Sequence, residues 1–252
     1  MAKQPKYVIY VENRSIVVPG DVVAAGDVAI ETPHLLHRLP DGRIVAMVTG
    51  LVEVEQSDDR ASIKLIPLKG RYIPKEGDIV IGVVCDIGIT AWFVDIRAPF
   101  TAVLNASDYL GGKPFNPATD NLRKYLDVGD VIIAKVAQFD RTRDPILTVQ
   151  EKGLGKVVEG SLIEIEPSRV PRVIGRKRSM ISMIQELTQC NIVVGNNGRI
   201  LLKCPNPEIE AVAILAIKKI EAEAHTQGLT ERVREFIIEE KIKRGLISRG
   251  VS

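Results

Sequence analysis

The spacing of apolar residues changes once along this chain, close to Lys152, and that change constrains the fold more than any other feature. Before it, short alternating runs such as Ile44–Val48 are separated by turn signals such as Pro40-Asp41-Gly42. After it, a strand at 161–166 precedes apolar residues at helical spacing from Met180 to Leu187. We therefore expect an all-β region followed by an α+β module.

The predicted fold is multidomain, with three segments. Residues 1–68 predict an all-β N-terminal domain, and the polar stretch Lys69–Pro74, with its glycine and proline, marks a boundary. Residues 69–152 predict five strands and a short helical piece near Asn121–Tyr125, a pattern that suits a small closed β-barrel. Residues 153–252 predict an α+β module with strands at 161–166, 191–194 and 199–203 and helices at 179–189 and 207–224. A C-terminal helix is expected from Thr230 to about Arg244, with Thr230 as its N-cap and Gly245 as its stop.

The stretch Ile174–Ser179 places three consecutive cations at the expected start of a helix. A glycine lets the backbone approach another backbone closely, and a helix N-terminus offers unpaired N–H groups to an anion. Residues 156–252 hold 16 of the 34 Lys and Arg residues but 12 of the 32 Asp and Glu residues, so the positive excess lies in this part. We predict a site for nucleic-acid phosphate here, with a solvated helix start as the alternative. Its expected residues are Gly175, Arg176, Lys177, Arg178, Arg169 and Arg172.

Cysteine and histidine positions indicate no metal site and no catalytic centre. The chain has three cysteines, Cys85, Cys190 and Cys204, and their odd number and their spacing suit neither a zinc site nor a disulfide framework. We therefore expect buried free thiols at Cys85 and Cys204. His34 and His37 lack further ligands nearby. No nucleophile–base set and no Walker-type loop is recognisable. The sequence predicts no metal, no cofactor and no enzyme.

The sequence also shows no segment that we expect to cross or enter a membrane. The first residues lack the apolar core of a signal peptide, and no apolar run reaches the roughly 18 residues that span a bilayer. Only 4% of residues are aromatic, which is low for a protein that reads bases mainly by stacking. We expect a soluble, reduced, cytoplasmic protein.

Two segments resemble known RNA-binding domains. Residues 160–220 resemble a KH domain, through Ile163–Pro167 as first strand, Val173-Ile174-Gly175 as entry to the phosphate loop, and Ile184–Thr188 in the following helix. Residues 77–151 resemble an S1-type OB barrel, through Gly82–Val84, Phe93–Asp95, Leu104–Ser107, Val128–Asp130 and Leu147–Glu151. With the β domain in front, the order over nearly the whole chain resembles the RNA-binding cap subunits of the archaeal exosome.

That resemblance implies a non-catalytic role. In the family, three cap subunits sit on a six-membered phosphorolytic ring, docked through the N-terminal domain. The S1 and KH domains gather single-stranded RNA above the pore and feed its 3′ end inward, with a preference for A-rich tails. The implied partners are therefore RNA and the ring subunits, and the sequence leaves open whether other cap proteins mix in. The alternative is an S1–KH transcription or translation factor, although such factors usually carry a second KH domain, for which the residues after 224 are too few.

The phosphate loop departs from the KH pattern at one position. Arg178 stands where the usual Gly-x-x-Gly loop has its second glycine, and a side chain there narrows access and disfavours a positive φ. A second stretch, Gly195-Asn196-Asn197-Gly198, resembles an element noted in exosome KH domains for domain packing. We interpret it foremost as a hairpin turn, then as an interdomain contact, and last as an RNA clamp.

The S1 resemblance also locates a nucleic-acid face. S1 domains usually carry two aromatics and a histidine there, and by alignment these positions are Thr90, Phe93 and Asn105, so one ring remains. Trp92 should point to the opposite face, into the core or an interface. Asp140 and Arg141 take the place of an acidic–basic pair near the RNA. The basic loop residues expected to face RNA are Arg97, Arg141 and Arg143, and we expect weak, sequence-tolerant binding dominated by charge.

Overall fold

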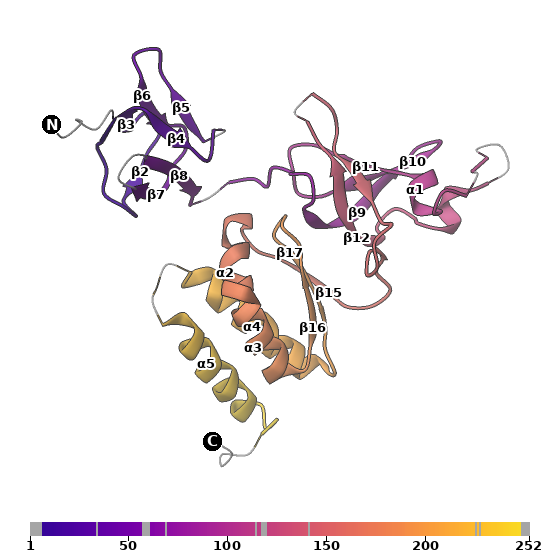
Figure 1. Ribbon diagram of the computed structural model, residues 1–252. Coiled ribbons are helices and arrows are strands. Elements are labelled where there is room, and N and C mark those ends of the chain that lie inside the picture. Colours follow the sequence, from indigo (N-terminus) through magenta and orange to yellow (C-terminus); the bar gives the residue numbers. More distant parts are fainter. Residues whose placement is uncertain are drawn as a thin grey trace. The chain divides into compact units, whose positions relative to one another are not determined.

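The computed structural model describes residues 7–33, 35–56, 61–68, 70–113, 115–116, 120–140, 142–224, 226 and 228–247 (Figure 1). The chain divides into two units, Met1–Gly70 and Arg71–Ser252. The first is a β domain, and the second contains a barrel followed by an α+β domain. No helix among these residues is long and apolar enough to cross a bilayer.

The first unit consists of two small sheets around one apolar core, which confirms the predicted all-β domain. One sheet has the order β1 (Tyr7–Ile9), β3 (Val22–Gly26), β6 (Arg43–Ala46) and β5 (Leu36–Arg38). The other has the order β2 (Ile16–Val17), β7 (Gly50–Gln56), β8 (Ala61–Pro67) and β4 (Val28–Ile30), with β4 parallel to β8. Alternation puts Val23, Ile44, Val52 and Ile63 inside, each fully buried.

Residues 79–156 form the predicted barrel. Its strands are β9 (Ile79–Ile87), β10 (Ala91–Asp95), β11 (Ala102–Asn105), β12 (Val131–Gln138) and β13 (Ile146–Thr148), and the β12–β13 pairing closes the ring, with β14 (Gly155–Lys156) added beside β12. Between β11 and β12 lie α1 (Ala106–Tyr109) and the 3-10 turn η1 (Leu122–Lys124), at the predicted short helix. A Cβ at Gly82 would lie 2.2 Å from Cγ1 of Val94, so glycine allows the barrel to close here.

Trp92 lies in the barrel core. Its side chain is fully buried, and its indole N–H donates to the carbonyl oxygen of Leu126 at 3.0 Å. The ring meets Tyr109 edge to face, with centroids 5.2 Å apart. The strand alternation that predicted an inward Trp92 is therefore confirmed.

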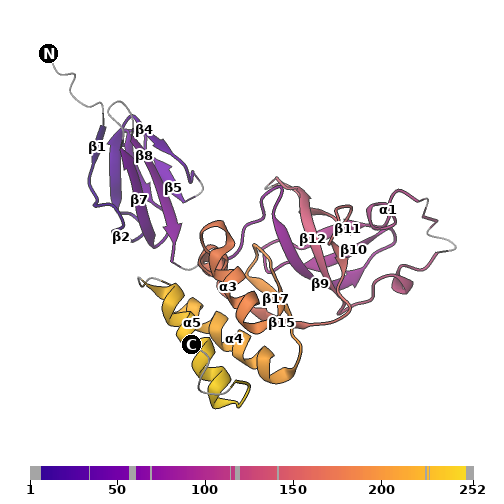
Figure 2. The same cartoon turned by 60° about the horizontal axis from the view of Figure 1, so that its bottom comes forward.

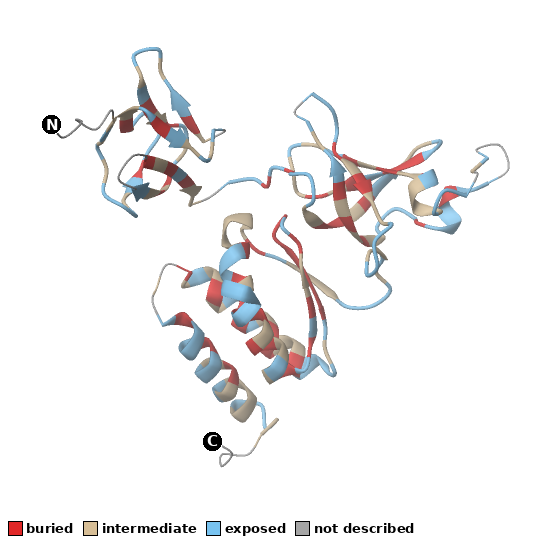
Figure 3. Cartoon of the chain, viewed as in Figure 1, coloured by how far each residue is buried: buried red, intermediate tan, exposed pale blue. Residues whose placement is uncertain are grey.

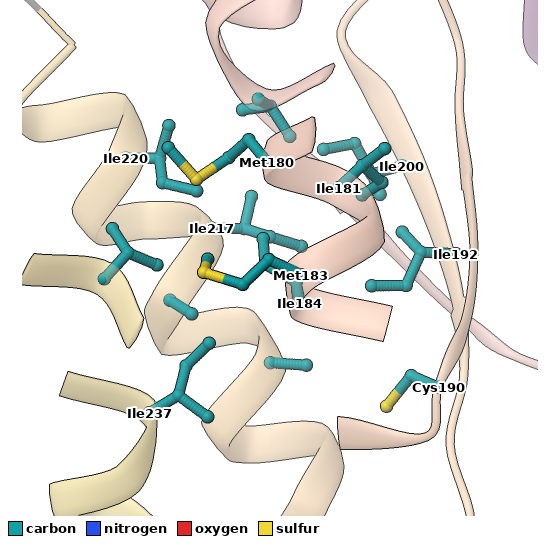
Figure 4. Close-up of a cluster of buried hydrophobic side chains, with 14 of the residues drawn as sticks. Met180, Ile181, Met183, Ile184, Cys190, Ile192, Ile200, Ile217, Ile220 and Ile237 are labelled. Carbon is teal, nitrogen blue, oxygen red and sulfur yellow. The ribbon is translucent and has the colours of Figure 1, made fainter. Parts of the chain in front are cut away.

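The KH region pairs a three-stranded antiparallel sheet with helices. The sheet order is β15 (Ser161–Glu164), β17 (Arg199–Lys203) and β16 (Asn191–Val194). Figures 1 and 2 show α3 (Ser179–Thr188) and α4 (Pro207–Ala222) on one face of this sheet, with α5 (Leu229–Lys243) packed on the outer side of them. Figure 3 shows α5 buried on one side and exposed on the other. The core beneath these helices, drawn in Figure 4, includes Met180, Ile184, Ile192, Ile217 and Ile237.

Two helix starts differ from the prediction. The short helix α2 (Val170–Ile174) follows the 3-10 turn η2 (Pro167–Arg169) and was not expected, because Pro171 and the short length masked its pattern. Proline is tolerated in the first helical turn, where its missing N–H has no partner to lose. The last helix begins at Leu229 with Gly228 as N-cap, so Thr230 is not the cap. Its predicted stop is confirmed, since Gly245 has φ of 70° directly after the final turn.

The prediction of buried free thiols at Cys85 and Cys204 is wrong at both positions. Cys85 is free but exposed, because Val80 and Val84 point into the barrel core and alternation along β9 puts Cys85 on the outer face. Cys190 and Cys204 form a disulfide. They sit one step beyond the last rung of the β16–β17 ladder, Asn191 to Lys203, which brings their Cα atoms to 4.2 Å. Sequence spacing could not reveal this register.

Candidate RNA interface

Gly175 shapes the predicted phosphate loop between α2 and α3. Its φ is 74°, and a Cβ there would lie 2.7 Å from the backbone nitrogen of Met180. Only glycine therefore lets the chain turn so tightly onto the first turn of α3. The N–H of Arg178 donates to the carbonyl of Gly175 at 3.2 Å, which closes the turn η3 (Arg176–Arg178).

The three cations of this turn are available to a ligand. Arg176, Lys177 and Arg178 are exposed, and none forms an ion pair with a carboxylate among the residues the structure describes. Arg178 occupies the N-cap of α3 without a side-chain capping bond. Three positive side chains therefore lie at the N-terminus of that ten-residue helix, whose dipole favours an anion there.

Arg178 adopts the conformation that a second glycine would serve. Its φ and ψ are 66° and 15°, and Lys177 before it is also left-handed, with φ of 49°. Each such residue costs on the order of 1 kcal/mol when it is not glycine. The chain keeps the shape of a Gly-x-x-Gly loop and carries a guanidinium in place of its last glycine.

Arg169 and Arg172 lie on the segment that leads into this loop. Arg169 ends η2 and is half-buried, and Arg172 is exposed on α2. The Arg172 guanidinium donates to the carbonyl oxygen of Thr226 at 2.7 Å, so part of its hydrogen-bonding capacity is used within the domain. The structure thus gathers the predicted KH residues along one continuous stretch of chain.

Phe93 and Asn105 share the outer face of the barrel. Strand pairing sets Phe93 opposite Val103, and Asn105 lies two residues further along the same strand, so their side chains emerge on one side. Phe93 is 36% exposed, and its pairing partner on the neighbouring strand β9 is Asp86. This face offers one ring and one amide, with a carboxylate beside them, so it is a weak site for stacked bases.

The three predicted barrel arginines have different surroundings. Arg143 is exposed in the loop after β12, near Asp140. Hydrogen bonds from Thr142 and the positive charge of Arg143 hold the pKa of the Asp140 carboxyl below its usual value. Arg141 lies outside the described residues. Arg97 turns toward the KH domain, where its Nη1 donates to the carbonyl oxygen of Ile165 at 2.9 Å.

The Gly195–Gly198 turn joins β16 to β17, and its residues hydrogen-bond to the barrel. Asn197 is fully buried, and its amide accepts from the N–H of Ile81 (3.3 Å) and donates to the carbonyls of Ile81 (2.8 Å) and Ile96 (3.0 Å). The N–H of Asn196 donates to the carbonyl of Ile79 at 2.8 Å. The turn thereby satisfies backbone groups of β9 that no barrel strand pairs, and Figures 1 and 2 show its tip beside that strand.

Sequence reasoning missed one group of charges at this contact. Arg199 is 5% exposed, with Nη2 at 2.5 Å from Oδ2 of Asp95 and Nε at 3.0 Å from Oε1 of Glu164. Burial alone would raise the pKa of Asp95, but the N–H of Arg97 and the Arg199 guanidinium outweigh it and lower that pKa. No motif marks these residues, because Asp95 is 104 positions from Arg199.

Comparison with known proteins identifies the families to which the barrel and the α+β domain are similar. Residues 72–157 match the family model described as the S1 domain of exosome complex component RRP40, and residues 160–208 match that of a KH domain. The exosome complex component Rrp4 of Ignisphaera aggregans is 61% identical over 93% of this chain and 94% of its own length. Rrp4 of Aeropyrum pernix is 47% identical over 90% and 94%. A solved structure described as an exosome complex RNA-binding protein is 54% identical, with a TM-score of 0.66 over 69% of this chain and 99% of its own.

The fold and the basic loop define a protein of the S1–KH class, in which a barrel and a KH domain follow each other on one chain. More narrowly, the extent of identity shows that the chain belongs to the Rrp4 family of exosome complex components, as its domain order predicted. Membership of that family confirms the prediction that the chain itself is not an enzyme.

Proposed function

We propose that this protein is the RNA-binding cap of a cytoplasmic exosome, with three caps per phosphorolytic ring that are either all copies of this chain or mixed with other cap proteins. Its N-terminal domain docks on the ring, and its S1 and KH domains recruit single-stranded RNA, including A-rich tails, and feed the 3′ end to the pore. The relatives named exosome complex components support this role. The observation that carries RNA binding is the exposed cluster of Arg176, Lys177 and Arg178 beside the α3 N-terminus, which forms no ion pair with any described residue.

Charge in this loop predicts a specific salt dependence. Each phosphate contact on a single strand contributes about −0.7 to the slope of log affinity against log salt. Replacing Arg176, Lys177 and Arg178 with alanine should therefore flatten the slope by about 2 and weaken binding at low salt. Fluorescence anisotropy with a labelled oligoadenylate, measured across a salt series, gives the slope directly.

A matched control keeps the net charge equal. Lys203, Arg234 and Lys243 are exposed cations of the same region, and each is paired with a carboxylate, at 2.6, 4.0 and 2.8 Å. Their triple alanine variant should retain the wild-type slope. The proposal for the loop is wrong if both triple variants change the slope equally or if neither does. Adding each variant to a purified ring and measuring 3′-to-5′ degradation then tests the recruiting role.

A further inference from the structure

Arg199 stands where the KH domain meets the barrel, and its whole guanidinium is committed there. Nε faces Glu164 of its own domain, Nη2 faces Asp95 of the barrel, and Nη1 donates to the carbonyl oxygen of Asp95 at 2.6 Å. Only 6% of the Arg199 side chain is exposed, whereas Asp95 and Glu164 are each 48% exposed. Arg199 is therefore the buried member of this group, and its two carboxylate partners are half-exposed to solvent.

Arg97 completes the group from the barrel side. Its Nε lies 3.5 Å from Oε2 of Glu164, and its backbone N–H donates to Oδ1 of Asp95 at 2.9 Å. Each domain thus supplies one cation and one anion, and each carboxylate bonds to both arginines. Hydrogen-bonded charge pairs are directional, so such a group fixes orientation more than it adds stability.

The contact also includes amide groups of the KH hairpin. Among them are the Asn197 amide and Asn196, whose Nδ2 donates to Oδ1 of Asp78 on the barrel at 2.6 Å. Amide and ion-pair contacts lose most of their favourable energy when the angle between partners changes, unlike apolar contacts. These directional polar groups therefore constrain the relative orientation of the barrel and the KH domain.

We propose that Arg199 is a positioning residue that holds the Phe93 face of the barrel and the Arg176–Arg178 loop in one fixed relation, so that a single RNA strand binds both. This inference rests on the proposed RNA-binding function. Two sites on a rigid body bind one strand more tightly than two sites on a loose tether, because the orientation is already set before binding.

The test compares RNA of two lengths in folded variants of the full chain. Arg199→Met removes the buried charge and leaves two half-exposed carboxylates, so no buried charge is left without a partner. Affinity for an oligoadenylate of about 12 nucleotides should fall about tenfold, while affinity for a tetranucleotide, which a KH loop holds alone, should stay the same. Lys203→Met, at an exposed site on the same strand, is the control and should change neither.

A second measurement reports orientation without RNA. Spin labels on exposed Cys85 and on Glu186→Cys, an exposed site of α3, should give one narrow distance distribution that broadens in Arg199→Met. Arg199→Lys keeps the charge but not the fork and should be intermediate in both readouts. If Arg199→Met does not fold, Arg199→Lys decides alone.

An unchanged distance distribution together with unchanged long-RNA affinity overturns the positioning role. An equal loss of affinity for both lengths overturns it as well, because a general structural defect would do that. Wild-type protein that binds neither RNA would refute the proposed function instead, and the distance distributions would still decide whether Arg199 sets the orientation.

Discussion

Arg178 shows how one residue can keep the shape of a loop and change its chemistry. In left-handed backbone an arginine pays a conformational penalty that a glycine does not, and Lys177 beside it is left-handed too. In exchange, a guanidinium lies at the first turn of α3, where an anion is already favoured. In the proposed function the loop binds phosphate through side-chain charge, where a Gly-x-x-Gly loop relies on close backbone approach.

Glycine substitutions separate conformation from charge at this loop. Arg178→Gly should leave the free energy of unfolding unchanged or raise it by up to about 1 kcal/mol, because strain at φ of 66° is relieved. Arg176→Gly, at a position without a positive φ, should lower it by roughly 0.5–1 kcal/mol. Both variants lose one cation, so both should weaken RNA binding alike. Urea unfolding measures the difference. Equal destabilisation of the two variants would contradict the conclusion that the backbone of Arg178 is strained.

The hairpin of β16 and β17 is held at both of its ends. At its tip the Gly195–Gly198 turn bonds to β9, and at its base the Cys190–Cys204 disulfide joins the strands. The same hairpin carries Arg199 at the first position of β17. Its register thus determines where the interdomain contacts fall, and a slip by one residue would turn Arg199 away from the barrel.

Loss of the disulfide should destabilise the KH domain measurably. The bond closes a loop between residues 14 positions apart, for which chain entropy predicts about 3 kcal/mol. Cys190→Ser with Cys204→Ser should lower the free energy of unfolding by up to that amount, and dithiothreitol should destabilise the wild type but not this double variant. Cys85→Ser at the exposed free thiol is the control and should change it by less than about 0.5 kcal/mol. Unfolding that is equally stable with and without reductant would show that the bond contributes nothing.

Elements with strong periodicity were predictable, and contacts between distant segments were not. The barrel strands, α3 and α4 follow from alternation and helical spacing, and Trp92 follows from its neighbours on β10. The helix α2 escaped because five residues with a proline carry too little pattern. The Arg199 contacts escaped because Glu164 and Asp95 lie 35 and 104 positions away. Arg97 was expected to face RNA from a loop, and only the fold reveals that it turns to the KH domain.

At the scale of the molecule, three separate apolar cores follow one another along the chain. One belongs to residues 1–70, one to the barrel and one to the KH domain. The last two lie within one unit and meet through the polar group around Arg199 and Asn197. A domain with its own core can unfold by itself, so cooperativity between the barrel and the KH domain depends on the contact between them, to which this polar group contributes.

Calorimetry of the full chain should resolve this arrangement. We expect one transition for the N-terminal β domain and one shared transition for the barrel and KH domain, because their contact couples them. Arg199→Met should leave the first transition in place and split the second into two, while Lys203→Met should leave both unchanged. Removing the Arg199 bonds takes away the coupling without opening either core, so the summed unfolding enthalpy should change little. A shared transition that merely moves to lower temperature in Arg199→Met, without splitting, would mean that other contacts join the two domains.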